Sequence, residues 1–143
     1  MSKVVSTRLQ DETFQRLSRV ARALDKTPSD TVATLIEESL RQLEFALIEF
    51  RSSSLGRQAF MKGSSLAVWE VIMIAQQYRM DIEKVAEHFE RPRAWVKAAC
   101  HYAEAYPQDI ELAIKDHQAV TFTDLKRLLP DIETFSVKAD SSQ

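Results

Sequence analysis

Cysteine and glycine are scarce in this chain of 143 residues, which has one cysteine, Cys100, and two glycines, Gly56 and Gly63. A single cysteine excludes an internal disulfide and is typical of the reducing cytosol. Two isolated glycines cannot form a glycine-rich phosphate-binding loop. No long uncharged apolar run is present, and Arg8 and Asp11 interrupt the N-terminal segment. We therefore expect a cytoplasmic protein with neither a membrane span nor a signal peptide.

Residues suited to catalysis or metal binding are few and badly spaced. The three histidines, His88, His101 and His117, lack the spacing of a metal site, and a lone pair such as His101 and Glu104 is more often a surface contact. Cys100 falls on an apolar helix face, and His101 points about 100° away from it around the helix, so a Cys–His nucleophile is not expected. We predict no catalytic residue, no metal and no cofactor, and hence a protein that is not an enzyme.

The composition that remains is that of a helical protein with an uneven charge. Hydrophobic residues make up 45% and charged residues 28% of the chain, and scarce glycine beside plentiful Ala, Leu and Glu favours helices. The net charge is −2, yet residues 1–28 hold six lysines and arginines against three carboxylates, a local charge of +3. A basic end on an acidic body favours nucleic-acid binding at that end.

The stretch Lys3–Leu9 has the alternation of a strand. Alternate side chains of a strand share a face, so Val4, Ser6 and Arg8 would lie together while Leu9 ends an inward face. No neighbouring stretch has the pattern of a hairpin partner, so the simplest partner is the same strand of a second copy. Such a two-stranded ribbon fits the major groove of DNA, where Arg contacts guanine. The alternative is a flexible N-terminal tail.

Two helices are expected next. The first begins at Asp11 and ends near Asp25, because Pro28 disfavours a helical residue before it. Ser29 is expected to cap the second helix, which would run to Phe50 with an apolar stripe roughly 30 Å long. One small helix cannot cover that stripe, so the second helices should pack across the axis of a dimer.

This order of strand, helix, turn and helix, with Thr7-Arg8-Leu9 and Pro28-Ser29 at the junctions, resembles the ribbon-helix-helix family of CopG-, Arc- and MetJ-type repressors and antitoxins. The resemblance covers about 45 residues of a domain expected at residues 1–50, and it implies an intertwined dimer that binds DNA. It places base contacts on Val4, Ser6 and Arg8, with Lys3 adding affinity for phosphate. It also implies phosphate binding at the start of the second helix, by Ser29, Asp30 and Thr31. Asp30 departs from the pattern because its charge repels phosphate.

The remaining residues are predicted to form a linker and a second domain. Serines and a glycine in residues 51–64 predict a flexible linker, within which Gln58–Met61 could be extended. Residues 65–137 predict a helical domain, with a new helix after a cap at residues 63–65, and residues 138–143 predict a disordered tail. The helices of that domain are expected at residues 66–80, 82–89 with Asp81 as cap, 92–105, from Pro107 onward, and from Thr121 or Thr123 to Pro130.

The second domain has two possible interpretations. Residues 82–105 resemble a helix-turn-helix, but Glu83, Glu87 and Glu90 would repel phosphate, so a helical interaction module is favoured. The runs Leu-Ala-Val-Trp-Glu-Val at 66–71, Val-Ala-Glu-His-Phe at 85–89 and Ala-Glu-Ala-Tyr-Pro-Gln-Asp-Ile at 103–110 resemble a small helical domain of VapB-type antitoxins. Those antitoxins neutralise PIN-domain ribonuclease toxins, so the resemblance implies such a partner.

The sequence therefore predicts a mainly α protein with an N-terminal ribbon-helix-helix domain and a helix-turn-helix-like C-terminal domain. Its predicted function is that of a sequence-specific DNA-binding repressor, the antitoxin of a type II toxin–antitoxin pair that represses its own promoter. It would bind a palindromic operator as a homodimer or higher oligomer. The alternative is a dimeric adaptor that does not bind DNA and whose C-terminal domain binds a protein partner.

Overall fold

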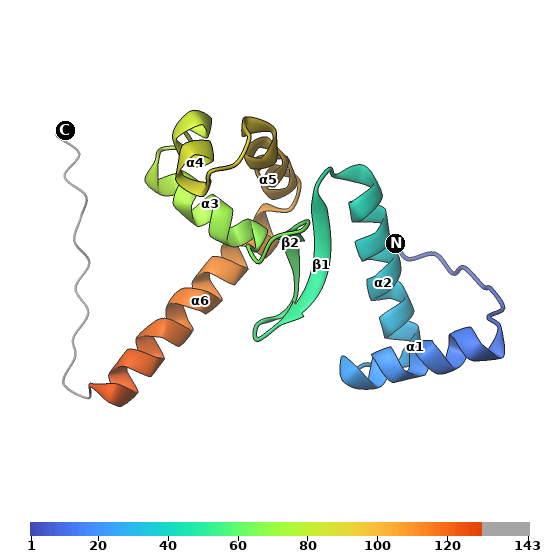
Figure 1. Cartoon of the computed structure of the whole chain (residues 1–143). Coiled ribbons are helices and arrows are strands. Elements are labelled where there is room, and N and C mark those ends of the chain that lie inside the picture. The colour runs from blue at the N-terminus through green and yellow to red at the C-terminus, as the bar shows by residue number, and fades with distance from the viewer. Residues whose placement is uncertain (130–143) are drawn as a thin grey trace.

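The computed structural model of the chain describes residues 1–129, which form six helices and one two-stranded antiparallel sheet (Figure 1). In chain order the elements are α1 (Asp11–Ala23), α2 (Pro28–Glu44), β1 (Ile48–Ser53), β2 (Gly56–Met61), α3 (Val68–Gln77), α4 (Ile82–Phe89), α5 (Arg93–Ala105) and α6 (Pro107–Leu128). The hairpin and α3–α6 form a body, and α1 and α2 make a V-shaped pair beside it. Of the helices in the described part of the chain, none is both long and apolar enough to cross a membrane.

Helix α3 is the centre of the body. It contacts α4, α5, α6 and β2, and Val68, Val71 and Ala75 on it are fully buried. The other buried side chains come mainly from the hairpin and α5, among them Met61, Trp95, Val96 and Tyr102. The prediction of a central core helix within residues 66–80 is confirmed, as is Asp81 as the cap of α4, where its carboxylate accepts from the Lys84 N–H.

The predicted linker is wrong, because residues 51–64 contribute most of a β-hairpin. Strands β1 and β2 pair in register from Ile48 opposite Met61 to Ser53 opposite Gly56. A tight turn through Leu55 joins them, and Gly56 adopts φ +97°, which an L side chain rarely adopts. Ile48, Ala59 and Met61 are buried in the hydrophobic core, and β2 contacts α3, so the serines and glycine mark a turn between two anchored strands.

Two predicted boundaries of the helices are also wrong. Helix α2 ends at Glu44 because the backbone of Phe45 is already extended, with φ −120° and ψ 125°. After Leu47, which has φ +62°, the chain enters β1, where Ile48 and Phe50 follow the two-residue period of a strand. Helix α6 runs without a break from Pro107 to Leu128, so neither Thr121 nor Thr123 starts a new helix. Pro130 and the tail predicted at 138–143 lie outside the described residues.

The largest correction concerns the start of the chain. Residues 1–10 form no strand and are all exposed, so the first element is a helix and the predicted ribbon-first fold class is wrong. A strand needs a neighbour for its backbone N–H and C=O groups. Within the described residues, β1 and β2 satisfy each other and no third strand is available to the N-terminal segment.

Helix α2 is capped two residues earlier than the sequence predicts. Thr27 is the cap, its hydroxyl accepting from the Asp30 N–H at 3.1 Å, and Pro28 occupies the first turn, where its missing N–H costs nothing. Ser29 is therefore inside the helix. Only Ala21, Thr31 and Glu38 are buried on α1 and α2, so this pair has almost no core of its own.

Candidate functional site

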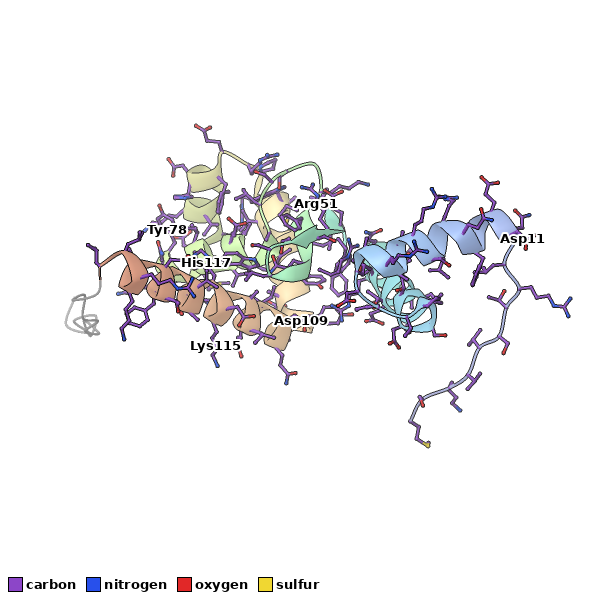
Figure 2. All side chains as sticks on the ribbon, turned by 90° about the horizontal axis from the view of Figure 1, so that it is seen from below. Asp11, Arg51, Tyr78, Asp109, Lys115 and His117 are labelled. Carbon is purple, nitrogen blue, oxygen red and sulfur yellow. The ribbon has the colours of Figure 1, made fainter. Side chains whose placement is uncertain are left out.

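The N-terminal arm, residues 1–10, carries four of the predicted DNA contacts. It leaves the start of α1 and extends into solvent away from the body, with Lys3, Val4, Ser6 and Arg8 all exposed (Figure 2). None of these side chains forms a hydrogen bond or ion pair within residues 1–129. Lys3 and Arg8 therefore carry full, unneutralised charge into solvent.

Helix α1 adds a row of arginines to this charge. Arg16, Arg19 and Arg22 are exposed and follow one another at three-residue spacing, which places neighbours side by side on a helix. Within the described chain none of them is paired with a carboxylate, in contrast to Arg41 of α2 and Arg57 of β2. The phosphate backbone of a nucleic acid is bound by unpaired cations of this kind, which here lie on α1 and on the arm next to it.

The start of α2 offers less to a phosphate than the sequence predicts. Thr31 is completely buried, and both its hydroxyl and its N–H donate to the Thr27 carbonyl, at 2.8 and 3.0 Å. The Asp30 N–H is taken by Thr27, and the Asp30 carboxylate faces solvent with a negative charge. Of the three residues predicted here, Ser29 alone is exposed and carries no opposing charge.

Large apolar side chains are left exposed along α1 and α2. Ile36 is 54%, Leu40 is 47% and Leu43 is 84% exposed, and their helical spacing places them on one side of α2. Leu9, Phe14, Val20 and Leu47, on α1 or in the segments next to the two helices, are also exposed by more than a third. Large exposed apolar side chains gathered on one part of a protein are typical of an interaction site. These residues are named the α1–α2 face, and their exposure indicates that a partner surface covers them.

Arg41 joins α2 to the body. Its guanidinium donates to the Tyr102 hydroxyl at 2.8 Å, to Asp109 at 3.0 Å and to Glu37 at 3.0 Å, and lies 3.6 Å over the ring of Tyr106. Burial acts to lower the pKa of Arg41, but the hydrogen bonds to Asp109, Tyr102 and Glu37 outweigh it and the net shift is upward. Burial raises the pKa of Tyr102, although the hydrogen bond from Arg41 opposes that shift.

Two more contacts complete this junction. Phe45, just after α2, meets the rings of Tyr102 and Tyr106 edge-on at 5.5 and 5.7 Å. Arg57 of β2 forms a bidentate ion pair with Glu38, which is buried. The N-terminal helices are therefore fixed to the body by an aromatic cluster and two ion-pair networks.

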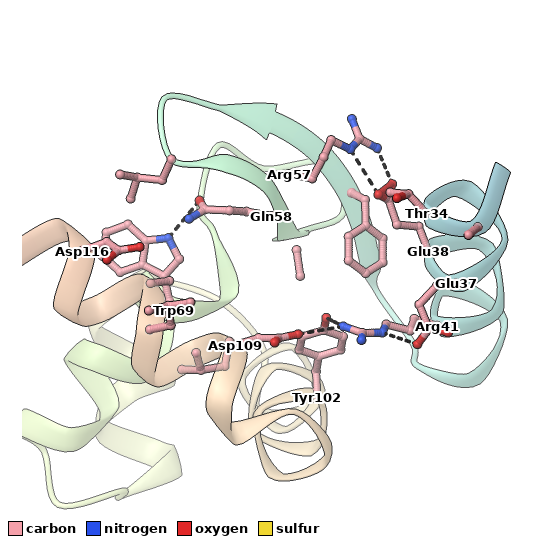
Figure 3. Close-up of a pocket in the computed structure, with 17 residues that line it drawn as sticks. Thr34, Glu37, Glu38, Arg41, Arg57, Gln58, Trp69, Tyr102, Asp109 and Asp116 are labelled. Atoms are coloured by element: carbon pink, nitrogen blue, oxygen red, sulfur yellow. Dashed lines mark hydrogen bonds and ion pairs between the residues drawn. The ribbon is translucent and has the colours of Figure 1, made fainter. Parts of the chain in front are cut away.

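A cleft of about 510 Å³ opens between α2, the hairpin and α6 (Figure 3). Its apolar walls include Phe50, Leu55, Ile110 and Ala113, while Trp69 donates to Gln58 at 3.1 Å at one end. The charged side chains that line it are Glu37, Glu38, Arg41, Arg57, Asp109 and Asp116. The sequence gives no sign of this cleft. Arg41 is 61 positions from Tyr102 and 68 positions from Asp109 along the chain, and no local pattern marks such contacts.

The predicted helix-turn-helix region has its cations partly engaged. Arg93 lies 3.5 Å from Glu83, and Arg91 lies over the buried ring of Trp95. Burial, with a smaller contribution from Glu104, raises the pKa of the Cys100 thiol, so this cysteine is a poor nucleophile. No group of three residues suited to a metal ion occurs in the described part of the chain.

The second half of α6 extends beyond the body. Ile110, Ala113, Ile114 and His117 of α6 are at least partly buried, and the centroid of the His117 ring lies 4.8 Å from that of the tilted Trp69 ring. Beyond them the α6 extension, residues 118–128, runs past the rest of the molecule in Figure 1. Its exposed apolar side chains are Val120, Phe122, Leu125 and Leu128.

Comparison with known proteins finds no match: no protein-family model, no curated protein and no solved structure matches this chain. The two family resemblances therefore stand only on the residues quoted for them, and the function must be argued from the geometry.

Proposed function

We propose that the chain is a homodimeric DNA-binding repressor whose N-terminal arm and α1 contact the DNA. The observation that carries this proposal is the juxtaposition of unpaired cations on the arm and α1 with the uncovered α1–α2 face. The unpaired cations suit a polyanion such as DNA. The α1–α2 face suits a protein surface, and a second copy bound there would bring two basic ends together.

A second copy is the partner that best fits the α1–α2 face. Two such faces packed about a two-fold axis would bury each other's leucines, and apolar burial of this kind drives association. The pairing would also join two basic ends of charge +3, giving one surface of +6 on two acidic bodies. That concentration of charge would draw the basic end to DNA and keep the bodies away from it.

The arm is the part of this surface suited to reading sequence. Arg8 can reach a guanine edge, Ser6 can bond to a base or phosphate, and Val4 can touch a thymine methyl. Lys3 and the α1 arginines would bind phosphates, which contribute affinity without specificity. A two-fold dimer would require an operator with matching two-fold symmetry, and hence a palindrome.

The α6 extension supports a second part of the proposal, the role of an antitoxin. Its exposed apolar side chains lie at the end opposite the arm, so a protein partner could bind there while the arm holds DNA. The resemblance to VapB-type antitoxins makes a PIN-domain ribonuclease the candidate partner and the shared promoter the candidate operator. If the arm does not bind DNA, the same extension favours a dimeric adaptor.

A fluorescence-anisotropy titration against the chain's own upstream DNA tests the proposal. We expect binding that weakens steeply with salt, as counterion release requires. We expect Arg8→Ala to cost about 1–3 kcal/mol on the preferred sequence and much less on random DNA. Lys115→Ala, which removes an exposed cation from α6, is the matched control and should bind as wild type. Binding that is absent at low salt, or equal in Arg8→Ala and wild type, would contradict the proposal for the arm.

A further inference from the structure

The cleft between α2 and α6 has a charge that its internal contacts do not cancel. Arg41 is held by Glu37 and Asp109, and Arg57 is held by Glu38. The fourth carboxylate, Asp116, is exposed and has no partner within residues 1–129. Four carboxylates against two guanidinium groups leave the cleft with a net charge of −2, focused beside low-dielectric walls.

The walls between these charges are apolar. Leu55 and Phe50 come from the hairpin, and Leu112 and Ala113 come from α6. Leu112 is 60% exposed although it lines the cleft, so apolar surface is still open to an incoming chain. A fitting occupant is thus an extended, basic segment with apolar side chains between its cations.

The N-terminal arm has this chemistry. Val4 and Val5 lie between Lys3 and Arg8, followed by Ser6 and Thr7; the two cations and the two valines are exposed, and neither cation is paired within the described chain. Its two cations match the net charge of the cleft, and alternation along an extended segment places Lys3 with Val5 on one side and Val4 with Arg8 on the other, so each side offers one cation and one valine. Figures 1 and 2 both place the arm and α1 on the far side of α2 from the hairpin and α6. A cleft filled by the arm of its own chain would require the arm to pass around α2, whereas the arm of a second copy has no such obstacle.

We propose that the cleft lined by Asp116, Leu112 and Phe50 binds the N-terminal arm of a second copy. This pairing does not require the proposed function. If the arm also binds DNA, the two uses compete, and the arm-bound assembly is the DNA-free form.

Disulfide trapping in the full-length chain tests the pairing without DNA. One preparation carries Val5→Cys and the other Leu112→Cys, and the two are mixed under mild oxidation. Leu128→Cys, on the same helix but outside the cleft and 78% exposed, is the matched control, and the unmodified chain with its buried Cys100 is the blank. We expect cross-linked dimers of Val5→Cys with Leu112→Cys to form at least about fivefold faster than with Leu128→Cys, because docking raises the effective concentration of the thiols.

Charge reversal gives a second readout. Asp116→Lys, which replaces attraction with repulsion, should lower the trapping rate about three- to tenfold, whereas Asp124→Lys on the same helix outside the cleft should leave it unchanged. Equal trapping at residues 112 and 128 would overturn the proposal. So would trapping found only within a chain that carries both cysteines, since that would assign the cleft to its own arm. Operator DNA should suppress the cross-link if the proposed function also holds; trapping that DNA leaves unchanged would count against DNA binding by the arm, and not against the pairing.

Discussion

Arg41 shows how much of this molecule depends on single side chains far apart in sequence. Its side chain is only 17% exposed and satisfies Tyr102 and Asp109 across the junction between α2 and the body. A buried cation with full hydrogen bonding is stable only while its partners remain, so removing it leaves a phenol and a carboxylate without their donor.

We therefore expect Arg41→Ala to lower the free energy of unfolding by about 2–3 kcal/mol, the usual scale for lost hydrogen bonds to a charged group. Arg16→Ala, which removes an exposed and unpaired arginine from α1, should change it by less than about 0.5 kcal/mol. Urea unfolding followed by circular dichroism measures both variants. Equal midpoints for the two would show that the junction does not stabilise the fold.

Tyr102 adds a dependence on pH. Its folded pKa is raised, chiefly by burial, so the unfolded chain loses the phenolic proton first. The stability due to the protonated phenol is complete below the unfolded pKa of about 10 and is lost as the pH rises through the folded pKa. We expect wild type to lose more stability than Tyr102→Phe between neutral pH and about pH 11, in thermal melts at several pH values. Parallel losses would contradict this assignment.

Among the elements, the β-hairpin is where sequence reasoning failed most clearly. The stretch Leu43, Leu47 and Phe50 fits a helical stripe, and three serines with Gly56 suggest a linker. In the fold, the same serines end β1 and begin the turn to β2, and Ile48 and Met61 are buried in the core of the body. A half-buried short strand is decided by what packs on it, which no local pattern contains.

Gly56 gives this element a test. A Cβ at position 56 would meet nothing within 4 Å, so the cost of Gly56→Ala comes from φ +97° alone. We expect a loss of about 1–2 kcal/mol in the free energy of unfolding. Ser54→Ala in the same turn should have little effect. A Gly56→Ala variant as stable as wild type would mean that the turn is not held in this conformation.

The helical elements were predictable for an equally physical reason. The apolar residues of α3 recur around the helix, and Asp81 precedes α4 with the chemistry of a cap, so both could be found locally. The candidate site also has a part that local sequence shows and a part that depends on tertiary packing. The exposed cations Lys3 and Arg8 are visible in the sequence, but the burial of Thr31 and the Arg41 junction depend on tertiary packing.

At the scale of the whole molecule, the uncovered α1–α2 face predicts the state of assembly. We expect light scattering at micromolar concentration to give at least twice the chain mass of 16.4 kDa. Leu43→Lys, which places a charge at the most exposed leucine of that face, should shift the balance towards monomer. Leu128→Lys on the α6 extension is the matched control and should leave the mass unchanged. A wild-type monomer would exclude the proposed dimer.

The junction at Arg41 also determines how far apart two bodies would stand. Because two ion-pair networks and an aromatic cluster fix α2 to the body, each body would follow its α2 as a rigid extension. In a two-fold dimer, the span between the two α6 extensions would then be a constant of the molecule. A partner that binds both α6 extensions at once must therefore match that span. A partner of a different span could bind only one of the two extensions.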